Sequence, residues 1–409
     1  MRDGLRVSLL SYDLVMAWDT ELTALTERIG RSLFVRPEPR ASFTDLVRGL
    51  LADVPRKNSW QLSDHVGHST ANRFEHLLDR AKWDVEVLRD QVRDYVVEYL
   101  GSPDAVLIAD DTQAIKKGDR SVGVARQYCG ATGQVENCQV MPMLTYASRA
   151  GHAFINRRLY LPESWAGDPD GRAVAGVPEH VAFATKPHLV IEMLEEEVAA
   201  GTPCAYLTAD AGYGRDPDLR AFCHRAERPI AYVMAVPVDL PVRTLDGGGE
   251  PVGHVLDRLL ALGQPLVWER RACGTGTKGI RAYDWASITV AVKDQDPAPG
   301  HAHTLLMRRS VADPGEIEFF LAHALEGTAI SELIRIAGMR SKIEENNEHG
   351  KDLLGLTQYQ VRKWTPWHRH VTTVMLALAF LAVTRARLTP TSPADRELGK
   401  ERFAQVPPN

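Results

Sequence analysis

The stretch Ala105-Val-Leu-Ile-Ala-Asp-Asp-Thr112 is a short apolar run that ends in two acids. Pro103 and Asp104 interrupt the pattern before it, so the run predicts a buried strand with Asp110 and Asp111 at its end. A second apolar run, residues 203–209, is followed in the same way by Asp210. Two strands of one sheet that each end in an aspartate can place their carboxylates side by side.

Either aspartate alone is more often a turn former or a helix cap. The pair indicates a bound cation, because neighbouring carboxylates repel each other unless positive charge lies between them. Ligand sets made only of oxygen atoms suit a hard ion such as Mg²⁺ or Mn²⁺.

Size and composition limit the classes of protein. A chain of 409 residues suggests two or three domains, and 44% hydrophobic with 25% charged residues is ordinary for a soluble globular protein. The N-terminus lacks the pattern of a signal peptide. The longest apolar run, residues 374–383, is about half of the ~20 residues that span a bilayer, so we expect a buried helix there.

The cysteines and the net charge give further limits. The five cysteines are odd in number and contain no Cys-x-x-Cys pair, which favours reduced thiols in the cytoplasm over a structural zinc site. A formal net charge of -5 gives no general support to nucleic-acid binding, so any basic surface must be local.

Residues 1–104 have helical periodicity. Within them, residues 58–80 are a helix-turn-helix candidate with two capped helices around Gly67, from which Arg73 could reach DNA. An ordinary helical hairpin is an equally good interpretation. After the first acidic strand, Lys116 and Lys117 open a glycine-rich loop near the acids, where solvated surface is the plainer alternative.

Residues 237–325 are rich in strands separated by turns. Gly274-Thr-Gly-Thr-Lys-Gly279 fits the dinucleotide-binding pattern, but a strand-like segment rather than a helix follows it. We therefore interpret it as a hairpin turn.

A helix is predicted over residues 331–354, with a break near Gly338. Arg340, Glu344, Glu348 and Lys351 lie along one face of it, which by itself is most typical of a solvated ion-pair ladder. The next block, residues 355–370, alternates cations such as Arg362 and Lys363 with aromatic residues. Such alternation suits phosphate contact and base stacking.

Taken together, these motifs resemble the DDE transposases of bacterial insertion sequences, in the branch with a β-strand insertion between the second aspartate and the glutamate. The resemblance spans roughly residues 50–388. It rests on these segments: Ile108-Ala-Asp-Asp-Thr112 with Lys116-Lys-Gly118 and residues 121–128, Thr208-Ala-Asp-Ala-Gly-Tyr-Gly214, Arg340-x₃-Glu344-x₆-Lys351, and Tyr359-Gln-Val-Arg-x-Trp364.

The resemblance implies an α/β fold: an RNase H-like core, in which helices flank a mixed sheet, with an all-helical N-terminal domain. The expected parts are a DNA-binding domain over 1–104, core segments over 105–236 and 326–390, a β-rich insertion over 237–325, and a flexible tail over 391–409.

The resemblance also implies the site and its partners. Asp111, Asp210 and Glu344 would be catalytic and would hold two Mg²⁺ (or Mn²⁺) ions, with Asp110 as the alternate to Asp111. The partner would be double-stranded DNA, at terminal inverted repeats and at a target, bound by a cytoplasmic, nucleoid-associated homodimer. The residues expected to contact DNA are Arg340, Lys351, Arg362, Lys363, Lys116, Lys117 and Arg73.

The implied activity is cleavage at element ends followed by strand transfer, with a hairpin intermediate as a further expectation from the insertion-bearing branch. Two other functions stay open. One is a transposase-derived DNA-binding regulator, since Ala337 and Asn347 replace the family's tyrosine and aromatic residue near the glutamate. The other is a metal phosphohydrolase for small substrates, which would leave the cation-aromatic block without a role.

Overall fold

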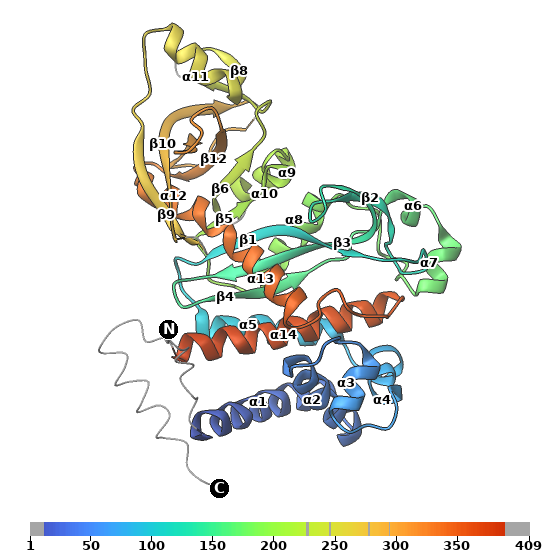
Figure 1. Cartoon of the computed structure of the whole chain (residues 1–409). Helices are drawn as coiled ribbons and strands as arrows, with labels where there is room; N and C mark the ends of the chain where they lie inside the picture. Colours follow the sequence, from blue (N-terminus) through green and yellow to red (C-terminus); the bar gives the residue numbers. More distant parts are fainter. Residues whose placement is uncertain (1–11, 226–228, 245–246, 277–278, 294, 389–409) are drawn as a thin grey trace, which may run out of the picture. The chain divides into compact units, whose positions relative to one another are not determined.

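The computed structural model describes residues 12–225, 229–244, 247–276, 279–293 and 295–388 (Figure 1). The chain divides into two compact units. We call residues 1–95, 175–177 and 349–409 the helical unit, and residues 96–174 and 178–348 the sheet unit. The expected tail, residues 391–409, lies outside the described residues.

The helical unit is built around its last helix, α14. Its helices are α1 (Tyr12–Leu33), α2 (Pro37–Leu51), α3 (Ser59–His65), α4 (Asn72–Glu75), the π-helix η1 (His76–Arg80), most of α5 (Val85–Leu100) and α14 (Trp364–Leu388). By length and composition α14 could cross a membrane, but every side chain from 371 to 380 is buried, as in the core helix of a globular protein. α14 packs against α2 and η1, which groups it with the N-terminal helices rather than with the sheet.

The helix-turn-helix candidate forms two short helices joined by a turn. The side chain of Asn58 accepts hydrogen bonds from the backbone N–H groups of Trp60 and Gln61 and so caps α3. Gly67 supplies the positive φ of 80° that the turn needs. The prediction of a cap on the second helix is wrong, because α4 begins only at Asn72 and has no side-chain cap.

The described residues of the sheet unit form one mixed sheet of twelve strands. Their order is β2-β3-β1-β5-β6-β12-β11-β10-β7-β8, with β4 paired to β3 and β9 paired to β10. The strands are β1 (Val106–Ile115), β2 (Ala125–Cys129), β3 (Gln134–Ala147), β4 (His152–Arg157), β5 (Tyr206–Ala209), β6 (Ala231–Val236), β7 (Pro241–Thr244), β8 (Gly249–Pro251), β9 (Glu269–Gly276), β10 (Gly279–Val292), β11 (His301–Arg309) and β12 (Ile317–Leu325).

Helices flank this sheet, which confirms the expected α/β class. They are α6 (Glu163–Ala166), α7 (Pro169–Ala175), α8 (Lys186–Ala199), α9 (Ala211–Gly214), α10 (Pro217–Arg225), α11 (Val252–Ala261), α12 (Ile330–Met339) and α13 (Ser341–Asp352). The strands of the predicted insertion do not form a sheet of their own, because β12 pairs with β6 and so continues the sheet. β9 and β10 pair antiparallel on either side of residues 277–278, as expected of a hairpin at the glycine-rich motif.

β1 is longer than expected. It continues through both acids to Ile115, because β3 pairs with it along its whole length. The expectation that Asp110 and Asp111 end the strand is therefore wrong, because β1 stays paired with β3 beyond both residues. The pairing of β1 with the parallel strand β5, however, stops at Ala109 and Ala209, immediately before Asp110 and Asp210.

A stack of aromatic rings lies on the sheet where β6, a strand of the predicted core, meets β12 and β11, strands of the predicted insertion. The strand registers align Tyr232, His323 and His303 across β6, β12 and β11. His224 of α10 lies over them, with its ring centroid 4.1 Å from that of His323. Burial is the main cause that lowers the pKa of His224 and His303 to about 4 and that of His323 to about 3. All three imidazoles are therefore neutral at pH 7.

This stack should make the sheet unit sensitive to acid. The folded-state pKa values lie below the unfolded value near 6.5, so the unfolded chain binds more protons between pH 6.5 and about 4. The free energy of unfolding should therefore fall as the pH drops through this range. His303→Leu should reduce that slope, because it removes one titrating group and two ring nitrogens that lack partners among the described residues. Urea unfolding at pH 7 and pH 5 measures this, and an unchanged slope would contradict it; exposed His180 provides the matched control, His180→Leu.

Candidate active site

Asp110 and Asp210 lie next to each other on neighbouring parallel strands. The register pairs Ala109 with Ala209, so the residue that follows each strand pair projects from the same face. The carboxylate of Asp210 also caps α9, accepting the N–H groups of Gly212 at 2.9 Å and Tyr213 at 3.1 Å. Asp210 is thus both the helix cap of the plainer interpretation and a neighbour of Asp110.

The electrostatics reflect this proximity. Burial, together with repulsion from Asp210 and then Asp111, raises the pKa of Asp110 to about 7. Arg340 is the nearby side chain whose positive charge favours the ionised form of Asp110 and so lowers its pKa. Two carboxylates held this way form an oxygen-only donor set that a hard divalent cation would fit.

Asp111 lies on the opposite face of β1. Its carboxylate is 2.5 Å from Nζ of Lys186, at the start of α8, and accepts a hydrogen bond from the side-chain amide of Gln113. Successive residues of a strand point to opposite faces, so the side chain of Asp111 points away from that of Asp110.

Glu344 stands on the same face as Asp110. Ile108 and Asp110 point the same way, and Ile108 is paired with Thr145, which binds Asn346 of α13. The guanidinium of Arg340 connects the two acids, lying 3.8 Å from Asp110 and 3.0 Å from Glu344. The helix breaks at Arg340, between α12 and α13, close to the predicted break at Gly338.

The acids do not form a finished ligand set. Among the described residues, no three His, Cys, Asp or Glu side chains are placed to hold a metal ion. The side chain of Glu344 is 51% exposed and is paired with Arg340. The structure therefore places Asp110 next to Asp210, while the guanidinium of Arg340 lies between Asp110 and Glu344.

Four polar residues fix α13 on the sheet, and no motif in the sequence marks His152 or Asn346 among them. Nε2 of His152 is 3.0 Å from the carboxylate of Glu345, and its Nδ1 is 2.8 Å from Oδ1 of Asn346. Asn346 is 1% exposed and donates to Oγ1 of Thr145 at 3.0 Å. The hydrogen bond from His152 is the main cause that lowers the pKa of Glu345 to about 2. No local pattern pairs residues almost 200 positions apart, so this network had no signal in the sequence.

A hollow of about 350 Å³ opens beside Arg340 and Glu344. Its other wall comes from the inserted strands and includes Tyr283, Arg308 and Phe320. The guanidinium of Arg308 lies 4.4 Å from the centre of the Tyr283 ring and 5.4 Å from that of Phe320, distances typical of cation–π contact.

The expected DNA-contacting residues fall into both units. In the sheet unit, Lys116 and Lys117 follow β1, and burial lowers the pKa of Lys116 to about 8. In the helical unit, Arg362 is exposed, Lys363 is 3.4 Å from Asp79, and Arg73 is 3.0 Å from Nδ1 of His68. Lys351 lies in the last turn of α13, on the helix that carries Glu344.

The interpretation of residues 355–370 as a base-stacking surface is wrong for most of its aromatic residues. Tyr359 and Trp367 are buried and bonded to each other. Arg369 donates to the backbone carbonyls of Leu77 and Trp83 and lies 4.5 Å from the centre of the Trp83 ring. These side chains hold the helical unit together, which leaves Arg362 and Lys363 as the exposed cations.

Two comparisons with known proteins bear on this site. Residues 31–290 match a family described as DDE superfamily endonuclease, a range that includes Asp110, Asp111 and Asp210 and ends before Glu344. The chain is also 26% identical over 187 residues to a protein of Microchaete diplosiphon named "Probable transposase for insertion sequence element IS701". That alignment covers 45% of this chain and 46% of the relative, so the chain spans about half the length of the curated relative.

Removing the anchor of α13 should cost stability. Asn346→Ala would leave Thr145 and His152 without the buried partner that they share, a loss of about 1–3 kcal/mol in the free energy of unfolding. Glu348→Ala, at an exposed position of the same helix, should change it by less than about 0.5 kcal/mol. Urea unfolding monitored by circular dichroism measures both, and equal stabilities would show that the network does not hold the helix.

Proposed function

The chain belongs to the DDE superfamily of endonucleases, and from this premise we propose that it is an insertion-sequence transposase that cuts DNA at element ends and transfers the cut strand to a target. The observation that carries the proposal is the pair of adjacent carboxylates, Asp110 and Asp210, on one face of the sheet. Glu344 and Arg340 stand on that face as well.

Asp110, Asp210 and Glu344 would hold the divalent ions. Two such ions, when bound, activate the attacking oxygen and stabilise the leaving oxygen of a phosphodiester. Repulsion between Asp110 and Asp210 favours the binding of a cation between them, because its positive charge would stabilise the ionised form of Asp110. The donor set is oxygen only, which favours Mg²⁺ or Mn²⁺.

We assign the role of the first metal-binding acid to Asp110, the alternate that the sequence also allows, in preference to Asp111. Asp110 shares a face with Asp210 and with the helix of Glu344, while Asp111 is held by Lys186 and Gln113 on the opposite face. Asp111 would then have a positioning role, fixing the start of α8 against β1.

Arg340 would change partners during the reaction. Without DNA its guanidinium bridges Asp110 and Glu344 and occupies the space that their common cation would need. A DNA phosphate offers it a bidentate partner of the kind that guanidinium groups favour. Its transfer to that phosphate would release both acids for the metal, so substrate binding would complete the site.

The same residues would serve both steps. Hydrolysis at the element end needs water as the nucleophile, and strand transfer needs the 3'-hydroxyl that hydrolysis leaves. Lys116, Lys117, Lys351, Arg362, Lys363 and Arg73 would bind backbone phosphates, and a homodimer would hold the two ends together. The hollow beside Glu344, with Arg308 and two aromatic rings, offers room for a nucleotide next to the cut.

A DNA-binding regulator derived from a transposase is a second candidate. It is favoured by one observation: the acids are bridged by Arg340 rather than gathered around a common point. Specific binding of duplex DNA without cleavage under Mg²⁺ or Mn²⁺ would support it.

Substitutions of the aspartates separate the two assignments of the first acid. Asp110→Asn and Asp210→Asn should each slow cleavage of a duplex carrying the sequences that flank the reading frame by about 10³-fold or more, since a lost metal ligand removes several kcal/mol of transition-state stabilisation. Asp111→Asn should slow it by less than about tenfold. Rates under Mg²⁺, with gel-shift binding as the control for folding, decide it. Parent-like cleavage by Asp210→Asn would reject the metal site, and the reverse order for Asp110 and Asp111 would restore Asp111.

Arg340→Gln should have opposite effects on metal binding and on cleavage. Without DNA, Mn²⁺ should bind several-fold more tightly, because a positive charge 3.8 Å from Asp110 is gone. Cleavage should fall, because a phosphate partner is gone. Titration calorimetry measures the first effect. Arg335→Gln is the matched control, since Arg335 is already paired with Glu332 at 2.7 Å. Identical Mn²⁺ affinity in Arg340→Gln and the parent would exclude competition for the site.

A further inference from the structure

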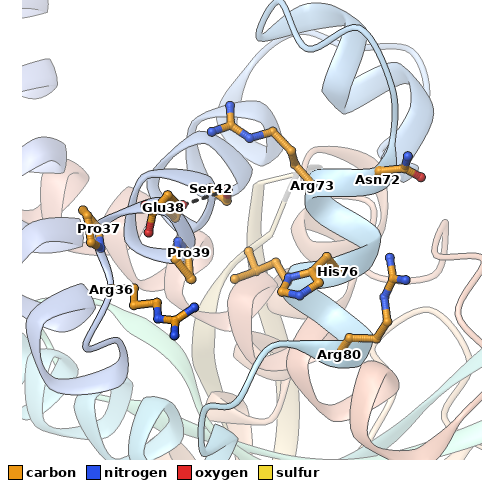
Figure 2. A pocket seen from close by; sticks show the side chains of 10 residues that line it. Arg36, Pro37, Glu38, Pro39, Ser42, Asn72, Arg73, His76 and Arg80 are labelled. Carbon is orange, nitrogen blue, oxygen red and sulfur yellow. Dashed lines mark hydrogen bonds between the residues drawn. The ribbon is translucent and has the colours of Figure 1, made fainter.

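A groove of about 770 Å³ runs between the start of α2 and the helix formed by α4 and η1 (Figure 2). We call it the arginine groove. Arg36 borders it on the α2 side, and Arg73, His76 and Arg80 border it on the other side. Positions 73, 76 and 80 are three and four residues apart, so they share one helical face.

The charges in the groove are mostly uncompensated. Arg36 and Arg80 have no hydrogen-bond or ion-pair partner among the described residues. Arg73 is hydrogen-bonded to His68, whose other nitrogen is 3.1 Å from Asp45, and no carboxylate of the described residues forms an ion pair with Arg73. Against these three arginines stands one lining acid, Glu38. In a chain of net charge -5, this is a local excess of positive charge.

The chemistry of the lining selects the kind of ligand. Seven of the ten residues that line the groove are polar or charged and three of them are arginines, whereas a small-molecule pocket has only a few polar groups. Guanidinium groups spread along a groove match an anion that repeats along its length. The backbone of duplex DNA is such an anion, with a regular series of phosphates.

We infer that the arginine groove binds the phosphodiester backbone of duplex DNA. This rests on the proposed function, which makes DNA the substrate, and adds a docking site that includes Arg36, a residue outside the helix-turn-helix candidate. Contacts to phosphates fix position and supply affinity without reading sequence. The groove therefore anchors the helical unit to any duplex, and base recognition belongs to other side chains.

Substitution of Glu38 should change DNA affinity in the direction opposite to substitution of the arginines. Glu38 lines the same groove as the arginines, so its negative charge would repel a phosphate bound there. Glu38→Gln should strengthen DNA binding, a result that damage to the fold would not produce. Arg36→Gln/Arg80→Gln should weaken binding. Arg31→Gln/Arg385→Gln removes the same charge from exposed positions of α1 and α14 that do not line the groove, and should have little effect.

The measurement is binding of the full chain to a labelled duplex of arbitrary sequence, by fluorescence anisotropy in EDTA at several salt concentrations. Each lost phosphate contact should reduce the slope of log affinity against log salt by about 0.9. We expect Arg36→Gln/Arg80→Gln to bind about tenfold more weakly than the control pair near 0.1 M salt, with a smaller slope. Glu38→Gln should bind more tightly than the parent.

Equal affinity and slope for the groove variant and the control pair would overturn the inference. So would a groove variant that loses binding to polyglutamate but keeps binding to duplex DNA, which would identify an acidic protein segment as the ligand. EDTA prevents cleavage, so these results do not depend on the acids. If Asp210→Asn cuts like the parent but the groove variants still bind weakly, the nuclease assignment fails and the groove stands.

Discussion

The parallel register of β1 and β5 is the constraint on which the candidate site depends. It stops at Ala109 and Ala209 and so sets two carboxylates beside each other with little solvent to separate them. Such an arrangement costs free energy unless a positive charge compensates it. In the structure, the guanidinium of Arg340 supplies this positive charge, and in the proposed enzyme a divalent ion would supply it. Both charges lie on the same face of the sheet.

The third acid depends on a long detour of the chain. After β6 the chain builds β7–β11, returns through β12 next to β6, and only then forms α12 and α13. Because β12 joins the same sheet, these helices cover the face on which Asp110 and Asp210 stand. His152, Glu345 and Asn346 then lock α13 in place. The inserted strands also supply Arg308, Tyr283 and Phe320 to the hollow beside Glu344, so they line the space next to the candidate site.

Arginines in the helical unit divide by burial into two roles. Arg369 is 5% exposed and donates its hydrogen bonds to backbone carbonyls, so it stabilises the folded helical unit. Arg36 and Arg80 are exposed in a groove and have no hydrogen-bond or ion-pair partner among the described residues, as the proposed DNA contact requires. Arginines of one unit can therefore be buried in its core in one place and exposed on its surface in another. Composition does not distinguish them, because burial is a property of the folded chain.

The sequence alone is enough to predict the family, the α/β class, the helical N-terminal region and the aspartates at the ends of two apolar runs, because these depend on local periodicity and short motifs. It also located the break in the helix that carries Glu344. Which of Asp110 and Asp111 faces Asp210 becomes known only from the folded chain, because it depends on the strand register and on the face to which each side chain points. The same holds for the network of His152 and Asn346, the burial of Tyr359 and Trp367, and the groove lined by Arg36 and Arg80. Each joins residues far apart in the chain, and no local pattern encodes such a meeting.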